Sequence, residues 1–233
     1  MKAFGRWMRG ALAAWICTAL PAAANECDRQ PVRAASVQAI GSDMVVNGSA
    51  MAVRAVTFDA PADEVAREFR AYWKREELPS QALSGKRGLT MSALDGICQY
   101  VLEMPAGQNG APSRGVMSVM RLDGSVHHAI PSSVAVLPGG AIRSDVESRD
   151  PDKVGRMWVI DLAGQAHGNA SRYRDALARS GWTALAPQPG YEWSGTNAPK
   201  YGLAMQKGRY QLDAAFSAQR GGTAAVINVT ESR

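Results

Sequence analysis

Long apolar runs are absent from this chain beyond residue 24, where no stretch approaches the roughly 18 residues that a membrane-spanning helix needs. The short motifs of several enzyme classes are absent too: the chain has no GxSxG, P-loop, GxGxxG, HExxH or paired CxxC. We therefore expect no transmembrane segment in the mature protein, no catalytic residues, no cofactor and no metal. An enzyme of unrecognised type stays open as an alternative.

The first 24 residues have the layout of a secretory signal peptide. Three basic residues precede an apolar run at about 11–20, and three alanines at 22–24 supply an A-x-A cleavage pattern. We expect cleavage after Ala24. Because this region is rich in alanine, we expect the mature protein in a bacterial periplasm. An uncleaved N-terminal anchor is the alternative.

Charge of one sign is not in excess once this signal is removed. The intact chain has 26 basic and 21 acidic residues, and the signal contains three of the basic ones and none of the acidic ones. The mature chain thus has 23 basic and 21 acidic residues, a formal net charge of +2. No basic stripe with interleaved aromatic residues is present, so the composition gives no support for nucleic acid as a partner.

Cysteine is scarce, and its position is informative. After signal cleavage only Cys27 and Cys98 remain. An even pair of cysteines in an oxidising compartment is most simply a disulfide. Closing this loop of about 70 residues is worth about 4 kcal/mol in the chain-entropy description. Two free thiols are the alternative.

Two parts of the chain resemble each other. At an offset of 104 residues the segment 67–78 lies over 171–182, and further along "GLTM" at 88–91 resembles "GLAM" at 202–205. This colinear series predicts an internal duplication. Each copy reads as one strand, one helix and three strands. We therefore expect an α+β fold of two tandem related β-α-β-β-β modules, each an antiparallel-rich sheet with one helix packed on one face.

The expected domain boundaries follow from this repeat. After the signal at 1–24, an N-terminal α+β module with a lead-in strand occupies 25–123 and a C-terminal module occupies 155–233. A connector with possible strands lies between them at 124–154, including one at "SSVAVLP". The sequence leaves open whether the two modules share one sheet.

Helical periodicity and capping residues place the two helices. In the first copy a helix begins near Pro61, and one face of it is marked by Val65, Phe69, Tyr72 and Trp73. In the second copy we expect Asn169 or Ser171 to cap the helix. Tyr173 and Leu177 lie on the inner face of this second helix, which Gly181 ends.

Two groups of polar residues contain the residue types of a reactive site. His127 and His128 are adjacent, but neighbours on a strand point to opposite faces, so a solvated linker is favoured over a metal site. Asp161, His167 and Ser171 have the residue types of a hydrolase triad. They flank a strand-to-helix loop, where an edge residue and a helix cap are the simpler interpretation.

The two copies differ most in one loop. From Trp182 to Gly202 the second copy is about ten residues longer than the first, and its content of proline, glycine and asparagine predicts a loop. This loop contains Tyr191, Glu192 and Trp193. Tyrosine and tryptophan supply a large contact area with few rotatable bonds. We expect these three residues to bind a partner. The alternative is that the two aromatic rings cover the sheet.

These observations favour an exported, periplasmic, non-catalytic binding or assembly protein. Its partner would be a protein of the cell envelope, a pilus or a secretion machinery. A binder of a small ligand or glycan in the cleft between the modules is an alternative, as is an enzyme of unrecognised type.

Overall fold

The computed structural model describes residues 27, 29–107, 110–124, 126–185 and 200–232. The expected signal peptide and the three expected binding residues Tyr191, Glu192 and Trp193 lie outside these described residues. Within the described ranges, no helix is long and apolar enough to cross a membrane.

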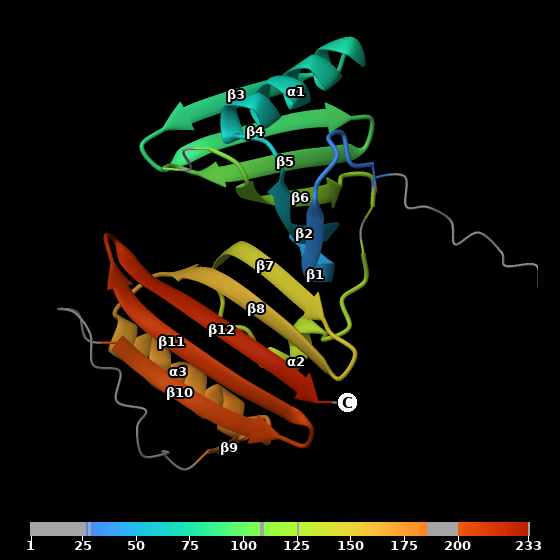
Figure 1. The fold of residues 1–233 in the computed structure, drawn as a ribbon. Helices are drawn as coiled ribbons and strands as arrows, with labels where there is room; N and C mark the ends of the chain where they lie inside the picture. The colour runs from blue at the N-terminus through green and yellow to red at the C-terminus, as the bar shows by residue number, and fades with distance from the viewer. Residues whose placement is uncertain (1–26, 28, 108–109, 125, 186–199, 233) are drawn as a thin grey trace, which may run out of the picture.

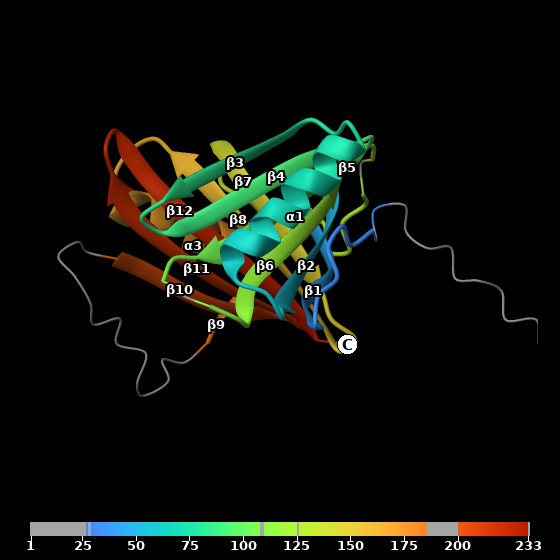
Figure 2. The same ribbon diagram turned by 45° about the horizontal axis from the view of Figure 1, so that its top comes forward.

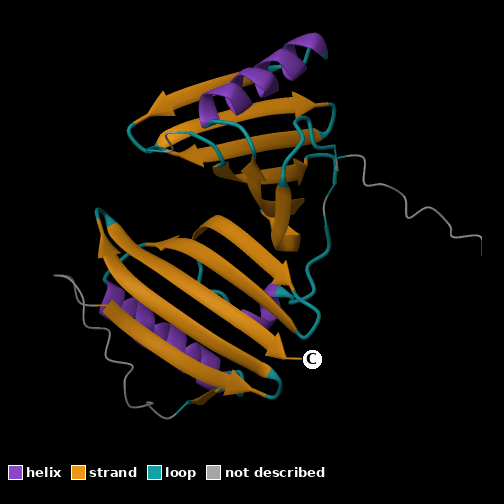
Figure 3. Ribbon diagram, viewed as in Figure 1, coloured by secondary structure: helices purple, strands orange, loops and turns teal. Residues whose placement is uncertain are grey.

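The described chain is dominated by β-strands (Figure 3). In chain order the elements are β1 (Ser36–Val46), β2 (Ser49–Phe58), α1 (Ala62–Arg75), β3 (Ser80–Gly85), β4 (Gly88–Asp95), β5 (Cys98–Pro105), β6 (Ser113–Arg121), α2 (Ser132–Ala135), β7 (Ala141–Arg149), β8 (Lys153–Leu162), α3 (Ala166–Arg179), β9 (Thr183–Ala184), β10 (Lys200–Lys207), β11 (Tyr210–Gln219) and β12 (Gly222–Ser232).

All twelve strands belong to one sheet in the order β3-β4-β5-β6-β2-β1-β7-β8-β12-β11-β10-β9. Every neighbouring pair is antiparallel. The expectation of an α+β fold rich in antiparallel sheet is confirmed at this level. Among the strands that the structure describes, the first half of the chain pairs with the second through β1 and β7 (Figure 1). The two halves therefore share one continuous sheet, a point that the sequence left open.

Both long helices pack on the same face of this sheet. Residues directly opposite on neighbouring strands point to the same face. The buried residues Val45, Glu147, Arg156 and Val229 follow one another across β1, β7, β8 and β12. Because the sheet twists strongly, α1 and α3 nevertheless lie on outer sides of the molecule, far from each other (Figures 1 and 2).

Each helix covers its own apolar core. In the first half Phe69 and Trp73 of α1 are buried, and Phe69 makes an edge-to-face contact with Phe58 of β2 at 6.1 Å between ring centroids. In the second half Tyr173 and Leu177 of α3 are buried in a separate core with residues of β8, β11 and β12. The expected inner faces of both helices are confirmed. Burying each such side chain contributes about 1.5–3 kcal/mol.

The helix ends differ in part from the sequence expectation. The second helix begins at Ala166, with Gln165 in the N-cap position, so neither Asn169 nor Ser171 caps it. Asn169 lies one turn inside, and its Nδ2 donates to the carbonyl oxygen of Ala163 and to Oγ1 of Thr223. Its amide is therefore used to join α3 to β12, which sequence periodicity alone does not show.

The C-terminal end of α3 is as expected. Gly181 has φ of 85°, a left-handed conformation that glycine adopts without a steric penalty. The backbone N–H of Trp182 then donates back to the carbonyl oxygen of Leu177 at 3.1 Å. This closes the last turn as a Schellman-type cap and directs the Trp182 ring into the core.

The disulfide is formed between Cys27 and Cys98, with 5.4 Å between their Cα atoms. Both residues are buried in the first core, and Cys98 is the first residue of β5. The N-terminal end of the described chain is therefore held against the first half, and the alternative of two free thiols is wrong.

Three described elements were not anticipated, namely α2, β3 and the two-residue strand β9. The segment expected as a strand at "SSVAVLP" begins instead with the short helix α2, which starts after Pro131 in the N-cap position. Strand β3 follows α1 directly, and every residue of it is exposed. Its sequence, SQALSG, has no alternation of apolar and polar residues, so periodicity could not reveal it.

Candidate functional site

The sheet face opposite the helices is uncovered in the part of the chain that the structure describes. On this helix-free face, Met120 of β6 lies opposite Met51 of β2, Met51 lies opposite Met44 of β1, and Met44 lies opposite Ser148 of β7. A second row runs beside it from Val46 through Val146 and Met157. Both rows cross the junction between the two halves of the sheet.

These residues form what we call the central stripe, an apolar area on β6, β2, β1, β7, β8 and β12. Its members are Met44, Val46, Met51, Val53, Val116, Met120, Val146, Met157, Val159 and Val226. The most open of them are Val116, Met157 and Val226, at 38%, 36% and 38% exposure. Apolar side chains at this exposure on a sheet face are available to a partner.

Charged residues border the central stripe but do not enter it. Arg114 marks its end on β6, and Asp161 marks its end on β8. Between them the remaining paired positions on this face of these strands carry glutamine, alanine, glycine, serine, threonine or asparagine, and Glu103 of β5 lies at the border, opposite Val116. Four of the stripe residues are methionines, whose flexible thioether side chains adapt to differently shaped partners. An apolar, adaptable and uncharged surface is suited to holding an apolar segment of another molecule.

The apolar character of strand β2 is a sequence feature that predicts this surface. Strand β2 reads SAMAVRAVTF, a nearly continuous apolar run rather than a strict alternation. Runs of this kind are typical of strands with both faces apolar. Only the sheet register, however, shows that β1, β2 and β7 bring such faces side by side.

The connector between the halves is anchored by a buried ionic network on the other face of the sheet. Glu147 of β7 has no exposed surface. Its carboxylate accepts hydrogen bonds from the backbone N–H of Ala129 at 2.9 Å and of Ile130 at 3.1 Å, and from Nε of Arg149 at 2.7 Å. Burial by itself raises the pKa of Glu147, but these hydrogen bonds together outweigh it, so the pKa is lowered.

A second ion pair lies beside Glu147. The Arg156 guanidinium donates two hydrogen bonds to the Asp145 carboxylate, at 2.8 Å and 2.6 Å. It also donates to the carbonyl oxygen of Ile130 and lies 4.8 Å from the ring centroid of Trp158. The hydrogen bonds that join Glu147 and Arg156 to residues 129 and 130 fix the connector on β7 and β8, which gives the network a structural role.

His128 is part of this network, which corrects the expectation of a solvated linker. Its Nε2 lies 3.7 Å from Asp145 and its Nδ1 lies 3.7 Å from Glu147, with only 18% of the side chain exposed. Both carboxylates are already occupied by arginines. Across the described residues, no group of three or more His, Cys, Asp or Glu side chains is placed to hold a metal ion.

The three residues with hydrolase-triad chemistry have separate partners. Asp161 pairs with Arg143 at 2.6 Å and accepts a hydrogen bond from Gln219. His167 lies on the first turn of α3 against the Tyr201 ring, and Ser171 accepts a weak bond from Arg174. The structure therefore does not bring these side chains together as a relay.

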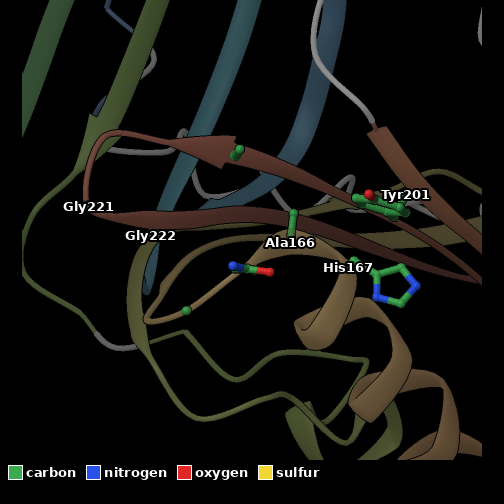
Figure 4. A pocket seen from close by; sticks show the side chains of 8 residues that line it. Ala166, His167, Tyr201, Gly221 and Gly222 are labelled. Atoms are coloured by element: carbon green, nitrogen blue, oxygen red, sulfur yellow. The ribbon is translucent and has the colours of Figure 1, made fainter.

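One open cavity of about 430 Å³ lies at the start of α3. Figure 4 shows His167 and Tyr201 on one side of it and the Gly221–Gly222 turn on the other. The two rings contact each other edge to face, with 5.2 Å between their centroids. The cavity is built by the second half alone, whereas the expected small-ligand cleft was placed between the modules.

Comparisons with known proteins gave no match: no family model, no curated protein and no solved structure resembles this chain.

Proposed function

We propose that this protein is an exported, non-catalytic binding protein that holds a protein partner of the bacterial cell envelope. The observation that carries the proposal is the central stripe, an uncharged and methionine-rich area that crosses the junction between the two half-sheets. The partner would present an apolar segment to this face. The signal-like N-terminus and the disulfide are consistent with export to an oxidising compartment.

We also infer that the two halves arose from a duplication. Each half has the order strand, strand, helix and four strands, and the strand order is the same when read outward from the β1–β7 junction. At an offset of 104, Met44 corresponds to Ser148, and these two residues lie opposite each other. The junction thus falls on a local two-fold axis, as expected for two copies joined edge to edge.

The correspondence between the two halves continues in strands farther from the β1–β7 junction. Gly96 and Gly208, 112 residues apart, occupy equivalent turns before β5 and β11, and both have φ of 57°. Because the junction brings the two uncovered faces together as one surface, the duplication doubles the area that a single module would offer. This gives the repeat a physical purpose in binding.

Site-specific crosslinking tests the proposed surface. A photoreactive amino acid would replace Val116 or Met157 in the central stripe, and Arg70 on the exposed side of α1 would serve as the control position. After irradiation in the producing bacterium, we expect the same envelope protein to be attached at both stripe positions and not at Arg70. Equal labelling from all three positions would contradict a specific surface.

A charge placed in the stripe supplies the matched loss-of-function test. Met157→Glu should reduce the yield of the crosslinked species at least about tenfold, because the partner would have to cover an unpaired charge. Tyr201→Ala, at the cavity beside α3, should leave the yield unchanged. The opposite pattern would favour the small-ligand alternative, with the cavity as its site.

Export is tested separately. The protein recovered from the periplasm should begin at Asn25, as N-terminal sequencing would show. A protein that retains residues 1–24 in the membrane fraction would contradict cleavage and favour the anchored alternative.

A further inference from the structure

The outermost strand of the first half has an unprotected edge. Within the described residues, strand β3 pairs only with β4, and its other edge presents backbone N–H and carbonyl groups without a strand partner. All six of its residues are exposed, including Leu83 at 67%. At the opposite end of the sheet the last strand, β9, has only two residues.

Strand β3 lacks the devices that usually prevent edge pairing. Natural edge strands are commonly shortened, bulged, or carry lysine or proline. The β3 sequence SQALSG has no charged residue and no proline, and its pairing with β4 is regular from Ser80 to Gly85. The strand is therefore competent to receive another strand along its free edge.

The charges that flank β3 identify the strand that fits it. Glu76 and Glu77 precede the strand, and Lys86 and Arg87 follow it. All four are exposed, and Glu77, Lys86 and Arg87 have no ion pair within the described part of the chain. Acidic residues at one end and basic residues at the other make this segment complementary to itself in the antiparallel direction. Parallel pairing would place like charges side by side.

We propose that β3 is a self-association edge whose occupant is β3 of a second copy of this chain. The two strands pair antiparallel about a two-fold axis near Ala82, which makes one sheet continuous through both molecules. Glu76 and Glu77 of each copy then lie beside Lys86 and Arg87 of the other. This geometry repeats between molecules what the β1–β7 junction does within one.

The expected dimer is transient. A pair of six-residue strands buries less surface than the 1,200–2,000 Å² typical of stable interfaces, so we expect a Kd on the order of 100 µM. Salt should weaken it further, because exposed ion pairs are screened. The edge lies at the outer end of the first half, away from the central stripe, so this inference does not depend on the proposed function (Figure 1).

Charge reversal tests the proposal. Sedimentation velocity of the purified protein over rising concentration should show a monomer–dimer equilibrium. The variant Lys86→Glu with Arg87→Glu, and the variant Glu76→Lys with Glu77→Lys, should each raise Kd at least about tenfold. An equimolar mixture of the two variants should restore association, because every pair of ends is then complementary.

Cysteine crosslinking locates the contact. Under mild oxidation Ala82→Cys, at an exposed position on β3, should form a covalent dimer, whereas Leu94→Cys, on the neighbouring interior strand β4 and 39% exposed, should not. Circular dichroism would verify that all variants fold. A wild-type protein that stays monomeric at about 1 mM, or a dimer that both charge reversals leave unchanged, would overturn the proposal. Equal crosslinking from the two cysteine positions would overturn it as well.

Discussion

Asn47 and Asp145, 98 residues apart in the chain, exchange two hydrogen bonds across the junction of the half-sheets. The backbone N–H of Asn47 donates to the carbonyl oxygen of Asp145 at 2.7 Å, and the backbone N–H of Asp145 donates to Oδ1 of Asn47 at 2.9 Å. They extend a ladder that has only three residue pairs. A single side chain thus contributes noticeably to joining the two halves.

Substitutions at Asn47 should separate the contribution of its side-chain hydrogen bond from that of its left-handed backbone conformation. Asn47 has φ of 50°, in the left-handed region that glycine tolerates and alanine does not. Asn47→Gly keeps this conformation and loses one hydrogen bond, so we expect about 1 kcal/mol of destabilisation. Asn47→Ala adds the backbone strain and should cost about 2 kcal/mol. Urea unfolding measures both values, and equal losses would show that the conformation contributes nothing.

Loss of Glu147 should destabilise the protein in a pH-dependent way. Glu147→Gln removes the charge that Arg149 and two backbone N–H groups stabilise, and we expect a loss of about 3 kcal/mol at pH 7. Because the folded-state pKa is lowered, this contribution is present above the unfolded pKa of about 4.3 and is lost as the pH falls through the folded value.

Urea unfolding at pH 7, 5 and 3 checks the direction in which the stability contribution of Glu147 changes with pH. The difference between wild type and variant should shrink in acid, although His128, Asp145 and Arg156 also face this site. The exposed carboxylate of Glu103 provides the control, and Glu103→Gln should have little effect at any pH. A difference that grows as the solution becomes more acidic would contradict the assignment.

Tyr173 should make stability fall in alkaline solution. Its hydroxyl donates to the carbonyl oxygen of Ala135 at 2.6 Å, and burial raises the pKa of Tyr173 above its usual value. Its contribution is therefore present below the unfolded pKa of about 10 and is lost as the pH rises above it. Tyr173→Phe should cost about 1–2 kcal/mol at pH 7, since Ala135 keeps a buried unpaired carbonyl.

The alkaline behaviour of Tyr173→Phe is the diagnostic measurement. Its unfolding free energy should depend less on pH above about 10 than that of the wild type. Tyr72→Phe, on the partly buried side of α1, is the matched control and should retain the wild-type dependence. Identical pH profiles for both variants would argue against a special environment at Tyr173.

The disulfide should account for a large part of the stability of the first half. Replacing both Cys27 and Cys98 with alanine removes a crosslink between residues 71 positions apart, and we expect a loss of about 4 kcal/mol. Thermal unfolding of the variant, and of the wild type with reductant, should agree. A stability change near zero in both would mean that the first core fixes the N-terminal segment without the crosslink.

Local patterns were enough to place the helices and several strands. Phe69, Trp73, Tyr173 and Leu177 recur at helical spacing, and all four are buried on the expected faces. Gly181 ends α3 because a left-handed residue is needed there, which is a property of the residue itself. The cysteine pairing was accessible because only two cysteines lie beyond residue 24.

The repeated phrase shows where sequence similarity misleads. "GLTM" and "GLAM" share three of their four letters at an offset of 114. The sheet, however, pairs Met91 with Leu102 and Met205 with Leu212. At the offset of 112 set by β5 and β11, Met91 corresponds to Leu203. A two-residue slip keeps each side chain on its original face, so the apolar pattern cannot distinguish the two alignments.

The sequence by itself determined the α+β composition, the inner faces of α1 and α3, and the cysteine pair, because these depend on short-range periodicity and on counting. Only the tertiary structure decided that the two halves share one sheet, that His128 lies half-buried between Asp145 and Glu147, and that methionines from distant strands form one stripe. Those features depend on which strand edges meet, and backbone groups that form a strand pair are nearly identical at every edge. The pairing of β1 with β7 is therefore decided by contacts between distant parts of the chain, and no local sequence pattern reveals it.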